Sequence, residues 1–125
     1  MDQKICLDTD ACIAIIKRKG PYQDILDKIL YSRIFISAIS EFELLLRTTN
    51  IEPVEAFIKD LEILDFDPIA ARKSSEIKKA LKGEGKEIEI RDLFIASSAI
   101  VNDCTLATLN IKDFKNIKDL KLLEF

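Results

Sequence analysis

Short apolar runs alternate with longer stretches of helical periodicity along the chain, and this alternation limits the possible folds most strongly. The strands that the pattern predicts are 4–8, 33–37, 63–66, 105–109 and 121–125. The helices that it predicts are 10–19, 22–31, 40–50, 53–61, 68–82 and 92–102. Strands separated by helices are typical of a parallel sheet covered on both faces. We therefore expect an α/β fold: a three-layer single domain over residues 1–125, with a central, mainly parallel sheet of four or five strands flanked by helices.

The composition agrees with one ordinary globular domain. The 125 residues are 48% hydrophobic with only three Gly and three Pro, which is enough for a sizeable core. The net charge of −3 neither indicates a nucleic-acid partner nor excludes one. No apolar run approaches the roughly 20 residues that span a bilayer, and no signal-like segment opens the sequence. We therefore expect a cytoplasmic protein with no membrane partner.

The sequence contains three cysteines and no histidine. Cys6, Cys12 and Cys104 form no CxxC pair, so we interpret them as buried, reduced thiols. The absence of histidine removes the Ser-His-Asp and Cys-His nucleophile arrangements and also the commonest general base. Carboxylates or lysines must therefore carry any catalysis.

Two carboxylates stand where the first predicted strand passes into the first predicted helix. Asp10 is expected to be the N-cap of that helix, because Asp is among the preferred residues at this position. Asp8 directly follows the apolar run that contains Ile5 and Leu7, where a cap fits less well, so a functional role is favoured. Parallel sheets bind ligands at the carboxyl ends of their strands, and Asp8 is expected at that edge.

Three further acids stand at unusual positions. Glu43 lies in a very apolar helix, where an ion pair with Arg47 one turn later explains it equally well. Asp92 shares a helix face with small residues that would let the helix approach the sheet closely; a favourable contact with the helix dipole is the alternative. Asp113 follows the strand 105–109 within one turn, and by itself it indicates only a loop.

The acids that could face one edge of the sheet are Asp8, Glu43, Asp92 and Asp113. Clustered carboxylates repel one another unless a cation lies among them. Hard oxygen ligands suit Mg²⁺ or Mn²⁺, which are commonly held by a few carboxylates together with substrate phosphates. Such a metal would activate a water, orient a phosphodiester and neutralise charge on the leaving oxygen, and this chemistry needs no histidine.

The segments LDTDACIAII, ISAISEFELLL and RDLFIASSAIVNDCTLATLNIKDF, in this order, resemble a PIN domain, specifically the small VapC-type toxins of prokaryotic toxin-antitoxin pairs. The resemblance covers nearly the whole chain. It implies that the metal-binding and catalytic acids of the family fall on Asp8, Glu43, Asp92 and Asp113. It also implies a Mg²⁺- or Mn²⁺-dependent endoribonuclease that is usually silenced by a small antitoxin and commonly forms a homodimer.

The resemblance also implies supporting residues around these acids. In this segment of the family either Asn110 or Asp113 touches the metal. Asp10 departs from the Asn or Ser usual in the family, and it is a cap, an orienting group or an extra ligand. The residues expected to orient the acids by hydrogen bonds are Thr9, Asp10, Ser37 and Asn110. The candidates for contacts with RNA phosphates, for which a solvated surface is the simpler explanation, are Lys17, Arg18, Arg91, Lys112 and Lys115.

Two alternatives stay open at this point. The segment LDTDA also resembles the DxDx(T/V) opening of haloacid-dehalogenase-type phosphatases, in which the first Asp becomes an aspartyl-phosphate. Cys12 stands where that motif has Thr or Val, and no clear paired-Asp motif follows. The second alternative is a PIN-like protein outside a toxin pair, either an RNA-processing nuclease or a non-catalytic RNA- or protein-binding module. The presence of all four acids argues against a loss of catalysis.

Overall fold

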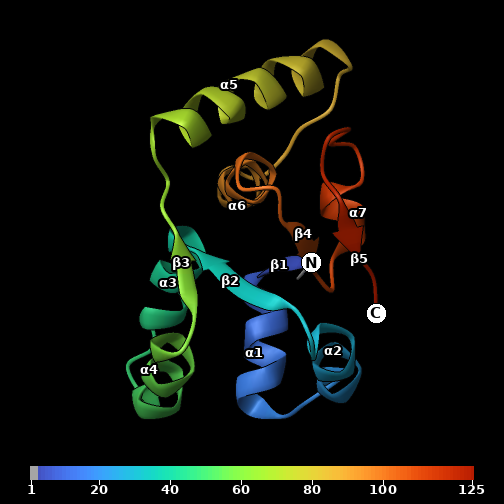
Figure 1. The fold of residues 1–125 in the computed structure, drawn as a ribbon. Coiled ribbons are helices and arrows are strands. Elements are labelled where there is room, and N and C mark those ends of the chain that lie inside the picture. The colour runs from blue at the N-terminus through green and yellow to red at the C-terminus, as the bar shows by residue number, and fades with distance from the viewer. Residues whose placement is uncertain (1–2) are drawn as a thin grey trace.

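The computed structural model describes residues 3–125. Its strands are β1 (Lys4–Leu7), β2 (Arg33–Ser37), β3 (Glu62–Leu64), β4 (Thr105–Ala107) and β5 (Leu122–Leu123). Its helices are α1 (Thr9–Lys17), α2 (Tyr22–Ile29), α3 (Ala38–Leu45), α4 (Ile51–Lys59), α5 (Pro68–Gly83), α6 (Ile90–Val101) and α7 (Ile111–Phe114). The strands form one parallel sheet with helices on both faces, so the predicted fold class is confirmed (Figure 1).

The order of the strands places β1 at the centre of the sheet. The order is β3-β2-β1-β4-β5, and every neighbouring pair is parallel. The chain builds outward from β1 to β3 and then returns to the other side of β1 to add β4 and β5. Connections that leave two adjacent parallel strands in opposite directions open a crevice at the carboxyl ends of those strands, and α/β sheets bind their ligands there. In this chain the strand order switches direction between β1 and β4, and the region at the carboxyl ends of these two strands is called the crevice below.

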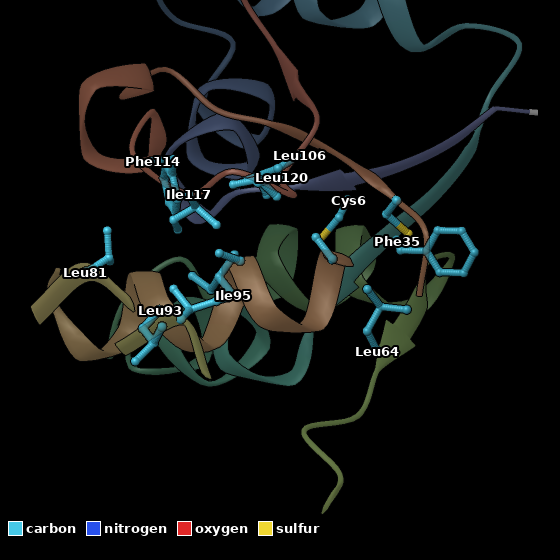
Figure 2. Close-up of a cluster of buried hydrophobic side chains, with 14 residues drawn as sticks. Cys6, Phe35, Leu64, Leu81, Leu93, Ile95, Leu106, Phe114, Ile117 and Leu120 are labelled. Carbon is cyan, nitrogen blue, oxygen red and sulfur yellow. The ribbon is translucent and has the colours of Figure 1, made fainter. Parts of the chain in front are cut away.

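Alternate residues of the strands pack into two separate cores, because successive side chains of a strand point to opposite faces. On one face, Cys6 and Leu106 pack with Leu93 of α6 and Phe114 of α7. Figure 2 shows the side chains of this first core gathered around α6, and α5 packs over α6 from outside. The other face is covered by α1, α2, α3 and α4 (Figure 1), and Ile5 and its neighbours form the second core there.

Two boundaries near the crevice differ from the sequence prediction. Helix α3 begins at Ala38 and not at residue 40, because Ser37 is its N-cap and accepts a hydrogen bond from the Ser40 N–H at 3.0 Å. Strand β4 ends at Ala107, so Thr108 lies beyond the strand and not within it as predicted. The second shift leaves the Thr108 side chain at the carboxyl edge of the sheet, the same edge at which Ser37 ends β2.

The remaining helices depart from the prediction in smaller ways. Helix α6 begins at Ile90, because Glu89 caps it and accepts hydrogen bonds from the first backbone N–H groups. Helix α4 begins at Ile51, which places Pro53 within its first turn, where proline is tolerated. The short helix α7 occupies a segment for which the sequence indicates only a loop. None of the helices within residues 3–125 has the length and apolar character needed to cross a membrane.

The three cysteines are free and buried, which confirms the interpretation of the sequence. Burial raises the pKa of both Cys6 and Cys12 above the usual value of a thiol. A protonated thiol is a poor nucleophile and a poor metal ligand. These side chains therefore contribute packing to the cores and no reactive sulfur.

Candidate active site

Polar side chains from three strands gather at the carboxyl edge of the sheet. Asp8 directly follows β1, Ser37 ends β2, and Thr108 directly follows β4. The backbone continues the pairing of β1 and β4 into this edge, because the Asp8 N–H donates to the Ala107 carbonyl at 2.9 Å. These residues therefore line the crevice that the strand order creates.

Asp8 is a buried carboxylate with hydrogen-bond donors on both oxygens. Oδ1 accepts from the Thr9 N–H at 2.8 Å and Oδ2 accepts from Thr108 Oγ1 at 2.7 Å. The residue is only 5% exposed, and burial, followed by the negative charge of Asp10, raises its pKa to about 7. Asp8 is also the N-cap of α1, so the assignment of that cap to Asp10 is wrong. The reason is that α1 begins at Thr9, immediately after the strand.

Asp10 connects the first helix to the loop after β4. Its Oδ2 accepts from Asn110 Nδ2 at 2.6 Å, and its Oδ1 accepts from the Leu109 N–H at 3.3 Å. Burial raises the pKa of Asp10, while these hydrogen bonds act in the opposite direction. The hydrogen bond between Asp10 and Asn110 therefore fixes the loop before α7 to the start of α1, and α7 carries Asp113. This is the role expected of orienting residues.

Glu43 is held through both of its oxygens by residues from other helices. Oε1 accepts from Thr9 Oγ1 of α1 at 2.7 Å, and Oε2 accepts from Arg91 Nη1 of α6 at 3.1 Å. The side chain is 19% exposed, so it faces the crevice and not bulk solvent. Within residues 3–125, Glu43 forms its ion pair with Arg91 and not with Arg47. Ser40 Oγ, which lies 2.9 Å from Thr9 Oγ1, adds a hydroxyl behind this contact.

Asp92 lies in the first turn of α6, next to the same group of acids. Burial raises its pKa to about 6, and the negative charges of Glu89, Asp113 and Glu43 act in the same direction. Asp92 also adds to the negative surroundings of Asp8. Ala96, one turn further along α6, is fully buried, which agrees with the expected close approach of this helix to the sheet. The negative charges of neighbouring carboxylates therefore help to raise the pKa values of Asp8 and Asp92.

The carboxylate oxygens at this edge are suitable ligands for a hard divalent cation. Carboxylate oxygens are the ligands that Mg²⁺ and Mn²⁺ prefer. The raised pKa of Asp8 reflects burial beside a like charge, and a cation would relieve that crowding. Within residues 3–125, however, no three Asp, Glu, His or Cys side chains already converge closely enough to hold an ion. The acids share an edge without forming a finished ligand set, since Glu43 and Asp10 are engaged by Arg91 and Asn110.

The structure brings only part of the predicted basic set to this edge. Arg91 contacts Glu43, while Lys112 lies in α7 next to Asp113 in the sequence and Lys115 is the C-cap of that helix. Lys17 and Arg18 lie at the far end of the nine-residue helix α1, about 13 Å along its axis from the crevice. Lys17 and Arg18 are therefore not part of the site as the structure presents it.

Sequence reasoning does not single out three polar residues of this edge. Thr108 is fully buried and donates to Asp8, while its oxygen accepts from the Asn110 N–H at 3.0 Å. Ser40 Oγ contacts Thr9 Oγ1. Glu89 is the N-cap of α6. A polar residue at the end of an apolar strand was a usable signal for Thr108, but the predicted strand extended past it.

A comparison with protein families matches residues 5–120 to the family described as PIN domain. The match extends over nearly all of the elements that build the sheet and the crevice. The chain belongs to the PIN domain family.

Within this family the chain is similar to proteins named VapC. It is 32% identical to the tRNA(fMet)-specific endonuclease VapC of Salmonella typhimurium, over 95% of this chain and 96% of that protein. It is 35% identical to ribonuclease VapC2 of Rickettsia felis, over 93% of each chain. The structure superimposes with a TM-score of 0.85 on a chain of VapBC2 from Rickettsia felis bound to a DNA fragment from their promoter. That match has 30% identity and covers 98% of this chain and 99% of the other.

Proposed function

We propose that this chain is an endoribonuclease that hydrolyses phosphodiester bonds in RNA and is the toxin of a type II toxin-antitoxin pair. The observation that carries the proposal is the group of carboxylates at the crevice between β1 and β4. Similarity along nearly the full length to a protein named tRNA(fMet)-specific endonuclease and to one named ribonuclease supports the reaction class. The similarity to a VapBC2 structure supports a protein partner of the VapB kind.

The residues proposed to bind the cation and to carry catalysis are Asp8, Glu43, Asp92 and Asp113. When bound, Mg²⁺ or Mn²⁺ supplies an activated water and neutralises charge on the leaving oxygen. Thr108 orients Asp8 through the contact to Oδ2, and Thr9 orients Glu43 through the contact to Oε1. These hydroxyls keep the carboxylates directed into the crevice, so that fewer rotamers must be frozen when a ligand binds.

The remaining polar residues position the surroundings of the site. Asp10 and Asn110 hold the loop that leads to α7, which carries Asp113. Ser37 caps α3 and thereby places the turn that precedes Glu43. The proposed contacts with the RNA backbone, whose cationic side chains complement phosphate, are Arg91, Lys112 and Lys115.

We assign the whole chain, residues 1–125, to one PIN domain with two protein partners. Helix α3 exposes Phe42 at 56% and Leu45 at 42%, and its C-cap Leu46 is 59% exposed. Clustered apolar side chains on a surface mark a protein contact. The proposed partners are a small antitoxin and a second copy of this chain, and the proposed location is the cytoplasm. Co-expression with the small protein of the same operon should yield a stable complex with suppressed cleavage.

The decisive experiment compares single-stranded RNA cleavage by the parent and by Asp92→Asn. The parent should cleave with Mg²⁺ or Mn²⁺ and stop in chelator, while Asp92→Asn should lose about two to four orders of magnitude. Asp65→Asn is the matched control, because Asp65 is an exposed carboxylate just beyond β3. Cleavage by Asp92→Asn at the rate of the parent would exclude the proposed site. Release of inorganic phosphate from small monoesters would instead support the phosphatase alternative.

A further inference from the structure

Arg91 stands at the mouth of the crevice with its guanidinium shared between two carboxylates. Nη1 donates to Glu43 Oε2 at 3.1 Å, and Nε donates to Glu89 Oε1 at 3.1 Å. The side chain is 51% exposed, whereas that of Glu43 is only 19% exposed. Arg91 therefore lies between solvent and the more deeply placed Glu43.

The two oxygens of Glu43 are held with different strength. The contact of Oε1 with Thr9 lies inside the crevice and is backed by Ser40. The contact of Oε2 with Arg91 is an ion pair at the surface, and exposed pairs of this kind contribute little. A divalent cation that binds Glu43 needs the same negative charge that Arg91 now neutralises. Thr9 would keep Glu43 in the crevice while Arg91 is displaced.

Arg91 can leave Glu43 without disturbing the start of α6. The N-cap of α6 is Glu89, which accepts from the backbone N–H groups of Arg91 and Asp92 at 3.2 and 3.4 Å. This cap uses no guanidinium atom of Arg91. The side chain retains Glu89 as a second anchor, so the displaced guanidinium stays at the mouth of the crevice. A guanidinium at this position presents several N–H donors that match the oxygens of a phosphate.

We infer that Arg91 couples metal binding to RNA binding: it occupies Glu43 until a divalent cation takes that carboxylate, and it then binds a phosphate of the RNA. The inference rests on the proposed function and adds an order of events at the same site. Both ligands favour separation of the same ion pair, so each should strengthen the binding of the other. Arg91 is thus a positioning residue for Glu43 and a contact for the substrate.

The test uses Arg91→Gln, with Arg33→Gln as the matched control. Arg33 forms a similar exposed ion pair with Glu62 at 3.0 Å, but it begins β2 and so lies at the opposite edge of the sheet. Titration calorimetry of the full chain with Mn²⁺, without RNA, should show binding about two- to tenfold tighter in Arg91→Gln than in the parent. Arg33→Gln should bind Mn²⁺ as the parent does.

The second measurement is cleavage of single-stranded RNA at saturating Mn²⁺. Arg91→Gln should raise KM by about tenfold or more with a smaller change in kcat, because a phosphate contact is lost while the cation site is intact. Arg91→Lys, which keeps the charge but not the planar donors, should recover part of the loss in KM. Thermal melts of each variant confirm that the chain is folded.

The two readouts separate the possible failures. Unchanged or weaker Mn²⁺ binding by Arg91→Gln would overturn the competition for Glu43. A KM equal to that of the parent would overturn the phosphate contact. If the parent cleaves no RNA at all, the proposed function fails, whereas the calorimetric comparison still decides whether Arg91 competes with the cation.

Discussion

The substitution Asp8→Asn probes the electrostatics of the crevice through folding stability. Burial and the charge of Asp10 raise the pKa of Asp8 from 3.8 to about 7. The folded protein therefore binds the proton more tightly than the unfolded chain. The contribution of Asp8 to the free energy of unfolding is fully present at low pH. It is lost as the pH rises from about 4 to about 7, because the folded state must then hold a buried charge. Asn keeps the shape of the protonated carboxyl and removes this penalty.

The size of the effect follows from the difference between the two pKa values. About three pKa units correspond to about 4 kcal/mol of unfolding free energy once Asp8 is ionised. Asn has one acceptor oxygen where Asp8 has two, so either the Thr9 N–H or the Thr108 hydroxyl loses its acceptor, at a cost of about 1 kcal/mol. We expect Asp8→Asn to be more stable than the parent by about 2–4 kcal/mol above pH 7, or about 10 °C in Tm.

The measurement is a series of thermal and denaturant unfolding curves in chelator between about pH 4 and pH 8. Chelator is needed because a bound cation would stabilise the ionised parent and hide the difference. Asp65→Asn, which removes an exposed carboxylate, should follow the parent across the range. An Asp8→Asn variant that is less stable than the parent at the upper end, or a difference that does not vary with pH, would refute this reasoning.

Three further predictions concern the same network and the core beneath it. Thr108→Val removes the hydroxyl between Asp8 and Asn110, and denaturant unfolding should show a loss of about 1–3 kcal/mol; a variant as stable as the parent would contradict the network. Phe114→Ala removes a ring that is 1% exposed and leaves a cavity, and the same assay should show a loss of about 3–5 kcal/mol in the free energy of unfolding; a loss below about 1 kcal/mol would contradict the packing. Mn²⁺ affinity, followed by calorimetry, should rise with pH through about 6 to 7 and level off only above about 8, because Asp92 and Asp8, whose pKa values burial raises to about 6 and about 7, must first lose their protons; a flat profile would exclude both as ligands.

Local signals in the sequence were sufficient to predict the layers of the fold. Parallel strands need crossover connections, so the alternation of strand and helix patterns implied helices on both faces of one sheet. The same local pattern predicted Asp8 at the carboxyl edge, since it directly follows an apolar run. It also predicted the close approach of α6, on which Ala96 and Ala99 are fully buried.

The errors arose where a local boundary depends on a distant partner. Strand β1 ends at Leu7 because its pairing with β4 ends at Ala107, and this brings the N-cap of α1 to Asp8 instead of Asp10. The end of β4 is set by the same pairing, which leaves Thr108 free to reach Asp8. A pattern within ten residues cannot reveal a limit set by a strand about one hundred residues away.

The sequence by itself determined that acidic side chains reach the carboxyl edge of the sheet, because the change from a strand pattern to a helix pattern is coded locally even where the exact boundary is not. Only the tertiary structure decided how those groups are paired. Thr108 and Asp8 are 100 residues apart, and Arg91 and Glu43 are 48 residues apart. Such contacts exist because β4 inserts beside β1 and because α6 crosses that edge next to α3, and neither arrangement leaves a periodic signal in the sequence. The competition between Arg91 and a cation for Glu43 is therefore a property of the folded chain.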